Sequence, residues 1–208
     1  MNASPTRVAV YIDWQNAYKT AREAFGMQAM PNEHGNFSPL QMARLFAAGN
    51  GRGQSGELVR VEIHRGLPSQ KFDQRGYAAN RRQSAAWIKE NRELVIPRMR
   101  PLRYDPYEPT ARPTEKGIDV QIAIGALEAV LTKRCDVAVV FSHDTDLLPA
   151  IETIARLKGR QAVETASWSS PSFPFRLRPK PLVAHHDISE QVFRRVETPV
   201  NYAYHEFR

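Results

Sequence analysis

The sequence predicts an α/β protein in which a mostly parallel five-stranded sheet lies between two helical layers, a three-layer α/β/α sandwich. Short apolar runs rich in β-branched residues alternate along the chain with longer segments of helical composition. Strands separated by helices form parallel sheets with helices on both faces. A chain of 208 residues can bury the core of one domain. We therefore expect a single domain over 1–208, with a core at about 7–166 and a C-terminal arm and helix at about 167–208.

The expected strands differ in their apolar patterns. RVAVYID at 7–13 is a compact apolar run, typical of a buried strand, and the second strand alternates apolar and polar residues. Pro97 and Pro101 cannot donate ladder hydrogen bonds, so the third strand is expected to be irregular or to lie at an edge. The five strands are expected at residues 7–13, 58–66, 94–104, 136–142 and 161–168.

The segments between the strands have helical composition. Ser38 is a typical N-cap and Pro39 suits the first helical position, which predicts a helix that ends near Asn50. The glycine-rich segment 49–56 and the proline-rich segment 105–117 are expected to be loops. The helices are expected at residues 16–25, 39–50, 70–93, 117–133, 146–159 and 185–197.

The composition is that of a basic globular protein. The 29 Lys and Arg against 22 Asp and Glu give a formal net charge of +7, which favours a polyanionic partner. No apolar run approaches the ~20 residues that span a bilayer, and the N-terminus lacks the pattern of a secretion signal. The single cysteine, Cys135, excludes a multi-cysteine zinc site and is expected to be buried. We therefore expect a cytoplasmic protein without a membrane partner.

Aspartates stand at the carboxyl ends of two expected strands. Ligands of parallel sheets bind outside those ends, near the point where the strand order reverses. Asp13 ends the first strand, and Asp144 and Asp146 follow the fourth, so we expect them at one edge of the sheet. The alternative for each is structural, because an aspartate after a strand commonly caps the next helix.

Asp119 lies in the first turn of the helix expected at 117–133. A carboxylate gains only ~0.3–1 kcal/mol from such a position. The helix is apolar almost all round, so Asp119 is expected close to the core, on the far margin of the apolar surface. The apolar stripe of this helix is expected to consist of Val120, Ile124, Leu127 and Leu131.

Carboxylates that converge require a compensating cation. Two carboxylates ~4 Å apart repel by about 4 kcal/mol at an effective dielectric constant near 20. Oxygen ligands favour Mg²⁺ or Mn²⁺ over zinc, and such an ion can activate a water and neutralise charge on a phosphate. Asn16 is expected to orient a carboxylate or bind a water, and Asp146 to bind through a water. The predicted ligands of the ion are Asp13, Asp119, Asp144 and Asp146.

Three segments follow one another in a recognisable order: AVYIDWQN at 9–16, EKGIDVQIA at 115–123 and VVFSHDTDLLPAI at 139–151. They resemble the three motif blocks of the NYN domain, a branch of the PIN-like nuclease superfamily, and in particular its LabA-like members. The resemblance covers roughly residues 7–166. It implies a parallel, Rossmann-like α/β/α fold, an acidic cluster that binds Mg²⁺ or Mn²⁺, and ribonuclease activity.

The resemblance assigns positions residue by residue. The aspartate of the first strand matches Asp13 and the nearby asparagine matches Asn16. The acid that follows Lys-Gly matches Asp119. The aspartate pair of the last block matches Asp144 and Asp146, with Ser142 before them.

The chain departs from the family pattern at three positions. Trp14 and His143 stand where the family often has glycine, and Leu147 replaces a common phenylalanine. His143 is a candidate substrate contact or general acid, and the alternative is a structural histidine at a strand end.

Basic and aromatic residues flank the expected site. Lys116, one turn before Asp119, and Arg65, near the end of the second strand, are candidate phosphate contacts; the alternative for each is a solvated surface charge. After the fifth strand, aromatic and basic residues interleave in a way that suits single-stranded RNA, although a packing arm or a homodimer contact fits the same pattern. This segment contains Phe173, Phe175, Arg176, Arg178 and Lys180.

The expected function is therefore that of a metal-dependent endoribonuclease acting on single-stranded RNA. The alternative is a non-catalytic, regulatory RNA-binding protein that retains the nuclease fold, which the departures at Trp14 and His143 motivate. A phosphatase with an aspartyl nucleophile often has Asp-x-Asp at the first strand end, but here the chain reads Asp13-Trp14-Gln15. The sequence names no reader of the 2′-hydroxyl, so a DNA nuclease stays open.

Overall fold

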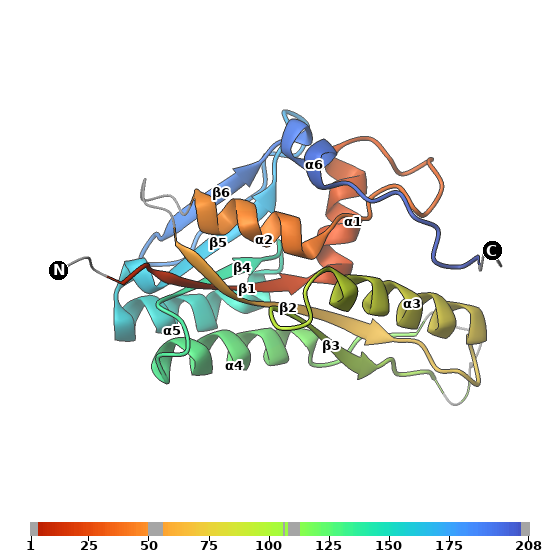
Figure 1. Ribbon diagram of the computed structural model, residues 1–208, viewed down its shortest axis with the longest axis horizontal. Helices are drawn as coiled ribbons and strands as arrows, with labels where there is room; N and C mark the ends of the chain where they lie inside the picture. The colour runs from red at the N-terminus through yellow and green to blue at the C-terminus, as the bar shows by residue number, and fades with distance from the viewer. Residues whose placement is uncertain (1–3, 50–55, 106, 108–112, 205–208) are drawn as a thin grey trace.

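A parallel sheet of six strands forms the middle layer of the computed structural model (Figure 1). The structure describes residues 4–49, 56–105, 107 and 113–204. Most of the glycine-rich segment predicted at 49–56, and the middle of the proline-rich segment predicted at 105–117, lie outside these residues.

The sheet contains the five predicted strands and one more. They are β1 (Arg7–Asp13), β2 (Glu57–Leu67), β3 (Val95–Pro101), β4 (Val137–Phe141), β5 (Val163–Trp168) and β6 (Ala184–Ile188). Their order is β3-β2-β1-β4-β5-β6, and every neighbouring pair is parallel. The proline-containing β3 lies at an edge, as predicted. The strand order reverses between β1 and β4, so this is where a ligand site is expected.

The last helix is shorter than predicted. Residues 184–188, most of which were assigned to a helix at 185–197, form β6, and only α6 (Glu190–Val196) is helical. The side chains of β6 meet polar partners in β5. His185 Nδ1 lies 2.7 Å from Thr165 Oγ1, and His186 Nε2 lies 2.7 Å from Glu164 Oε2. Residues 185–187 are His, His and Asp, so β6 lacks the apolar alternation that identifies strands in a sequence.

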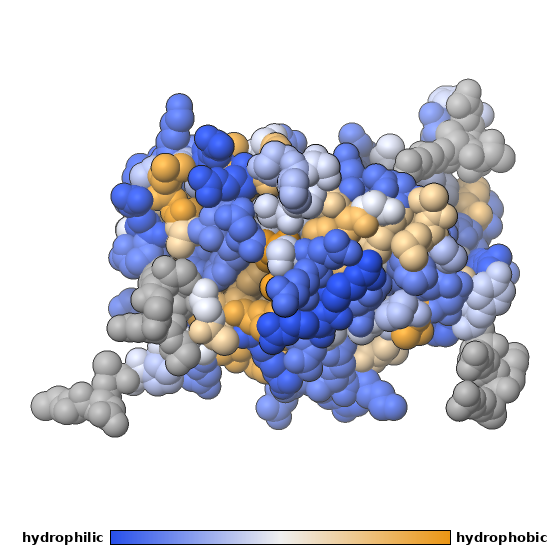
Figure 2. Space-filling view, turned by 90° about the horizontal axis from the view of Figure 1, so that it is seen from above, coloured by the Kyte–Doolittle hydropathy of each residue, from blue (hydrophilic) through white to orange (hydrophobic). Residues whose placement is uncertain are grey.

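Helices cover both faces of the sheet (Figure 1). One layer contains α1 (Trp14–Ala24), α2 (Pro39–Ala48), α3 (Gln74–Glu90) and α6. The other contains α4 (Ile118–Leu131) and α5 (Leu148–Lys158), with the short 3₁₀ turns η1 (Thr145–Leu147) and η2 (Arg160–Ala162) beside α5. Figure 2 views the molecule from the side of α1 and α6 and shows mainly hydrophilic side chains there. The three-layer α/β/α architecture is thus the predicted one.

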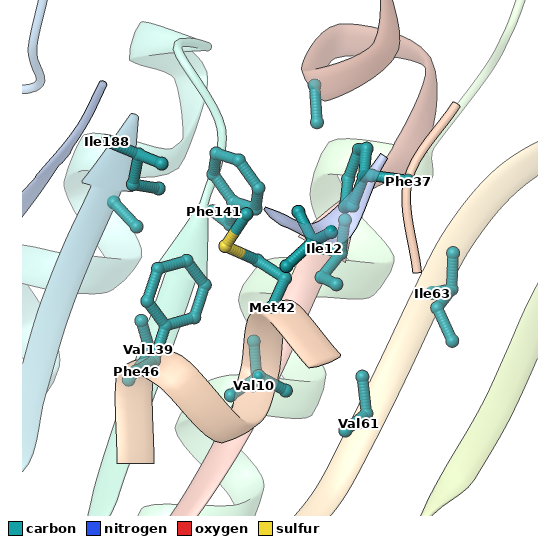
Figure 3. Packing of buried hydrophobic residues seen from close by; sticks show 14 of the residues in the cluster. Val10, Ile12, Phe37, Met42, Phe46, Val61, Ile63, Val139, Phe141 and Ile188 are labelled. Atoms are coloured by element: carbon teal, nitrogen blue, oxygen red, sulfur yellow. The ribbon is translucent and has the colours of Figure 1, made fainter. Parts of the chain in front are cut away.

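The core forms because β1 and β4 send alternate residues to opposite faces. Val10 and Ile12 point towards the α2 layer, where Met42 and Phe46 pack against them (Figure 3). Tyr11 belongs to the core on the α4 and α5 side. Because β1 and β4 are apolar on both faces, Asp13 at the end of β1 and Ser142 directly after β4 are the polar residues that these two strands bring to the carboxyl edge of the sheet.

The buried face of α4 differs from the predicted one. Val120, Ile124 and Leu131 are 54%, 59% and 40% exposed. Because α4 is apolar almost all round, periodicity alone could not select the face that packs on the sheet. The residues that pack there are Ile118, Ile122, Ala126, Ala129 and Val130.

Two expectations from composition can be compared with the structure. Cys135 is buried, as predicted, and burial raises the pKa of its thiol to about 11. Within the described ranges, no helix combines the length and the apolar character needed to cross a bilayer.

Candidate functional site

Asp13 ends β1 at the point where the strand order reverses. Its side chain is 7% exposed. One carboxylate oxygen accepts a hydrogen bond from the backbone nitrogen of Asn16 at 3.3 Å, which caps α1, and the other accepts from Ser142 Oγ at 3.0 Å. The capping interpretation therefore holds for Asp13, and it leaves a nearly buried carboxyl group at the switch point.

Ser142 joins the ends of β1 and β4. Its hydroxyl donates to Asp13 and accepts from the backbone nitrogen of Asp144 at 3.0 Å. Asn16 adds a second link, because its Oδ1 accepts from the backbone nitrogen of His143 at 2.9 Å. Asp144 caps η1 by accepting from the backbone nitrogen of Asp146 at 3.0 Å. The Ser142 hydroxyl thus links the carboxylate of Asp13 to the backbone of Asp144.

The electrostatics of Asp13 are unusual for a carboxyl group. Burial raises its pKa, the hydrogen bonds from Asn16 and Ser142 lower it, and the charges of Glu115 and Asp144 raise it again, to about 7. A carboxyl group shifted this far, at a sheet switch point and beside other acids, is typical of functional sites.

Glu115 is a site residue that the sequence interpretation missed. Its Oε1 accepts from the backbone nitrogen of Gly66 at 2.7 Å, near the end of β2. A Cβ atom at Gly66 would lie 2.2 Å from Leu102 Cδ2 and 2.7 Å from Glu115 Oε1, so any larger residue would force these two side chains to shift. The available signal was an acid directly before the Lys-Gly step, where Gly117 takes a left-handed conformation (φ 71°) to begin α4.

The other predicted site residues on this edge are more exposed to solvent than Asp13. Asp119 is half-buried in the first turn of α4, whereas Asp146 and Lys116 are exposed. Among the residues that the structure describes, no group of three or more histidine, cysteine, aspartate or glutamate side chains is arranged to hold a metal ion. The structure therefore joins Asp13 with Asp144, and ion binding by all four aspartates stays a prediction.

Arg65 differs from a solvated surface charge. Its guanidinium carbon lies 6.0 Å from the ring centroid of Trp14 and 5.6 Å from that of Trp87, and Nη1 donates to Gln83 Oε1 at 2.5 Å. Burial lowers its pKa to about 10 against the opposing effect of Glu115. Trp14 itself is 2% exposed and packs on Phe37 and Trp87, so this departure from the family pattern belongs to the core.

His143 lies under the C-terminal arm. It is 8% exposed, its Nε2 is 3.4 Å from the carbonyl oxygen of Trp168, and burial lowers its pKa. A carbonyl can only accept, so Nε2 carries the proton and Nδ1 is an acceptor, which is buried and has no partner within the described chain. The rings of Phe173 and Phe175 lie 5.3 and 5.5 Å from the imidazole ring.

The arm after β5 packs on the domain and also presents cations. Leu177 and Pro179 are buried, whereas Phe175, Arg176 and Arg178 are exposed. This alternation fits the predicted packing arm, and it leaves the basic side chains exposed. Their contact with RNA stays a prediction.

Comparison with known proteins identifies the family of the chain and a solved structure of similar fold. The model of the NYN domain, which belongs to the PIN-like nuclease superfamily, matches residues 7–177. The crystal structure of a protein of unknown function from Vibrio parahaemolyticus, VPA0982, is similar with a TM-score of 0.55 and 18% identity, over 91% of this chain and 96% of that one. This similarity supports the fold alone. No curated protein sequence matches the chain, and the LabA-like branch stays a prediction.

Proposed function

Because this chain belongs to the NYN domain family, whose fold is that of PIN-like nucleases, we propose that it is a divalent-metal-dependent endoribonuclease acting on single-stranded RNA. One observation carries the proposal. Asp13 is a nearly buried carboxyl group at the switch point of the sheet, and Ser142 ties it to Asp144. Such a group is costly to ionise unless a cation compensates its charge.

The residues present fit Mg²⁺ or Mn²⁺. Both ions prefer oxygen ligands, and Mg²⁺ typically takes one or two carboxylates and keeps several waters, so a cage of three protein ligands is not required. Asp13 and Asp144 would hold the ion directly, and Asp119 and Asp146 would act through water. When bound, the ion supplies an activated water and neutralises charge on the phosphate.

The surrounding residues position these carboxylates and the substrate. The Ser142 hydroxyl bonds the carboxylate of Asp13 and the backbone nitrogen of Asp144, and Asn16 fixes the backbone of His143. His143 is a further proposed substrate contact, because its buried acceptor Nδ1 has no partner within the described chain. The assignment of the partner as single-stranded RNA rests on the family, on the net charge of +7 and on the exposed Phe175, Arg176 and Arg178, since ring stacking and cationic grooves bind single strands.

The test compares two substitutions at opposite ends of β4. Purified protein is incubated with labelled single-stranded RNA and Mn²⁺, beside Asp144→Asn and the control Asp136→Asn. Asp136 is exposed and pairs with Arg7 before β4 begins. We expect Asp144→Asn to lower cleavage at least ~10–100-fold, the size of effects seen around metal sites, and Asp136→Asn to cleave as the wild type does. Equal cleavage by all three proteins contradicts the assignment.

A non-catalytic RNA-binding protein is the second candidate. One observation favours it: within the described ranges, no three histidine, cysteine, aspartate or glutamate side chains are arranged to hold a metal ion. This candidate predicts RNA binding that is unchanged by EDTA, with no turnover in Mg²⁺, Mn²⁺ or any other divalent ion. Cleavage that requires an added divalent ion rules it out.

A further inference from the structure

A cavity lies between α1, α3 and the C-terminal segment 200–203, lined by Trp14 and Gln15, which directly follow Asp13. Its volume is about 450 Å³, within the range of ~300–1,000 Å³ that is typical of ligand sites. Aromatic and amide side chains dominate its lining, among them Tyr18, Tyr202, Gln15, Asn32 and Asn80. Bases of single-stranded RNA are recognised by this combination, since rings stack on the base and amides bind its edges.

Two buried polar atoms of lining residues have no partner within the described part of the chain: Arg65 Nε, a donor, and Asn80 Oδ1, an acceptor. Asn80 Nδ2 donates to the carbonyl oxygen of Gly66 at 3.0 Å, which fixes the orientation of the amide and leaves Oδ1 free. Gln83 already accepts from Arg65 Nη1. Buried polar groups normally have partners, so these two atoms suit a ligand that offers both an acceptor and a donor, as a nucleotide does.

The C-terminal segment closes one wall of the cavity. Asn36 Nδ2 donates to the carbonyl oxygen of Val200 at 3.3 Å, and Arg82 Nε donates to that of Tyr202 at 2.7 Å. Asn36 Oδ1 also accepts from Gln83 Nε2 at 3.0 Å. The guanidinium of Arg65 is thus connected, through Gln83 and Asn36, to the wall that the chain end provides.

The cavity shares part of its lining with a second cavity that Glu115 lines. Arg65, Asn80 and Gln15 line both cavities, and the second has a volume of about 300 Å³. The charge of Glu115 acts on both Arg65 and Asp13. Gln15, two residues after Asp13, lines both cavities together with Arg65, so an RNA strand bound at Asp13 would pass along this lining towards Arg65.

We propose that this cavity binds one nucleotide of the RNA next to the cleaved phosphodiester, with Arg65 and Asn80 contacting it, and so sets the nucleotide preference. The proposal rests on the proposed function for its substrate, but binding can be measured without turnover.

The test fills the cavity from α3. Ala79 lines it, whereas Ala85 on the same helix is exposed and does not line it. Fluorescence anisotropy follows labelled single-stranded decamers of A, C and U in EDTA, where metal-dependent cleavage is absent. We expect Ala79→Phe to weaken binding of the preferred decamer about tenfold, the order of losing one stacked base, and Ala85→Phe to stay within about twofold. Wild-type affinity for Ala79→Phe, with a wild-type melting temperature, overturns the proposal.

A second pair of variants guards against misfolding of Ala79→Phe. Tyr202→Ala removes a ring from the C-terminal wall, and Tyr204→Ala removes an exposed ring that does not line the cavity. Only Tyr202→Ala is expected to weaken binding, and equal affinities for the two contradict the proposal. Parallel cleavage assays in Mn²⁺ separate the two claims. If the variants change binding as expected but the protein never cleaves RNA, the nucleotide-binding cavity is supported and the proposed nuclease activity is contradicted. If Ala79→Phe cleaves RNA with unchanged rate and nucleotide preference, the proposed role of the cavity alone is contradicted.

Discussion

Replacing Asp13 by asparagine is expected to stabilise the metal-free protein. Asparagine is also a good N-cap: its Oδ1 can accept the bond from the backbone nitrogen of Asn16, and its Nδ2 can donate to Ser142 Oγ in place of the bond that the carboxylate accepts. What it removes is the ionisation of a buried carboxyl group whose pKa lies at about 7, against 3.8 for an ordinary aspartate. Because the folded-state pKa is the higher one, the wild type loses stability as the pH rises from about 4 to about 7.

The size of the effect follows from the pKa difference. About three pKa units at ~1.36 kcal/mol each give an upper limit of ~4 kcal/mol well above pH 7, and relaxation around the charge reduces this to ~2–4 kcal/mol. For a domain of this size that is a rise in melting temperature of roughly 5–15 °C at pH 8. Towards pH 3 both the folded and the unfolded wild type are protonated, so the difference disappears.

Thermal unfolding in EDTA between pH 3 and 8.5 measures this difference. Asp146→Asn is the matched control, because Asp146 is an exposed aspartate of the same site, and its effect is expected to stay within ~0.5 kcal/mol. Asp13→Asn that is less stable than the wild type at pH 8, or a difference that does not change with pH, refutes the reasoning. Added Mn²⁺ is expected to stabilise the wild type and not the variant.

Three further predictions concern the fold. Burial raises the pKa of Glu62, but three neighbours lower it more strongly, to about 2. These are His64, Arg98 and Arg60, whose nitrogens lie 2.5–3.3 Å from the carboxylate oxygens of Glu62. Glu62→Gln should therefore cost ~2 kcal/mol at neutral pH in urea unfolding, and this cost should vanish as the pH falls from about 4.5 to about 2; a cost independent of pH contradicts it. Trp168→Phe removes the bond from Nε1 to the carbonyl oxygen of Ala17 at 2.7 Å and opens a gap in the core, so we expect a loss of ~2–4 kcal/mol with an unchanged denaturant slope. A loss below ~0.5 kcal/mol would show that the core closes over the gap. Gly66→Ala places a Cβ atom 2.2 Å from Leu102 Cδ2 and should cost ~1–3 kcal/mol in thermal unfolding, whereas wild-type stability would mean that Leu102 and Glu115 shift freely.

The parts of the fold that the sequence predicted correctly are those with a clear apolar pattern. β1 and β4 are short, apolar and bounded by polar residues, so both were recognised with nearly correct ends. β6 was missed because its two histidines bind polar side chains of β5, so its sequence lacks the apolar pattern of a buried strand. The wrong face of α4 was chosen because that helix is apolar almost all round and its packing depends on the sheet beneath it.

In the candidate site, too, some features could be predicted from the sequence and others could not. The positions of Asp13 and Asp144 followed from the rule that ligands bind at strand ends. The shared Ser142 hydroxyl and the contact of Glu115 with Gly66 join segments that are distant in the sequence, so no local pattern announces them. The burial of Arg65 depends on Trp14 and Trp87, from α1 and α3, and this too requires the folded arrangement.

The most direct test of the central claim is a crystal structure of the protein soaked in Mn²⁺, with the ion located by its anomalous scattering. The account predicts a peak at the switch point of the sheet, about 2 Å from carboxylate oxygens of both Asp13 and Asp144, and no such peak in Asp13→Asn. A wild-type crystal that holds Mn²⁺ only elsewhere, or none at this edge at saturating concentration, contradicts the claim that these carboxylates form the metal centre.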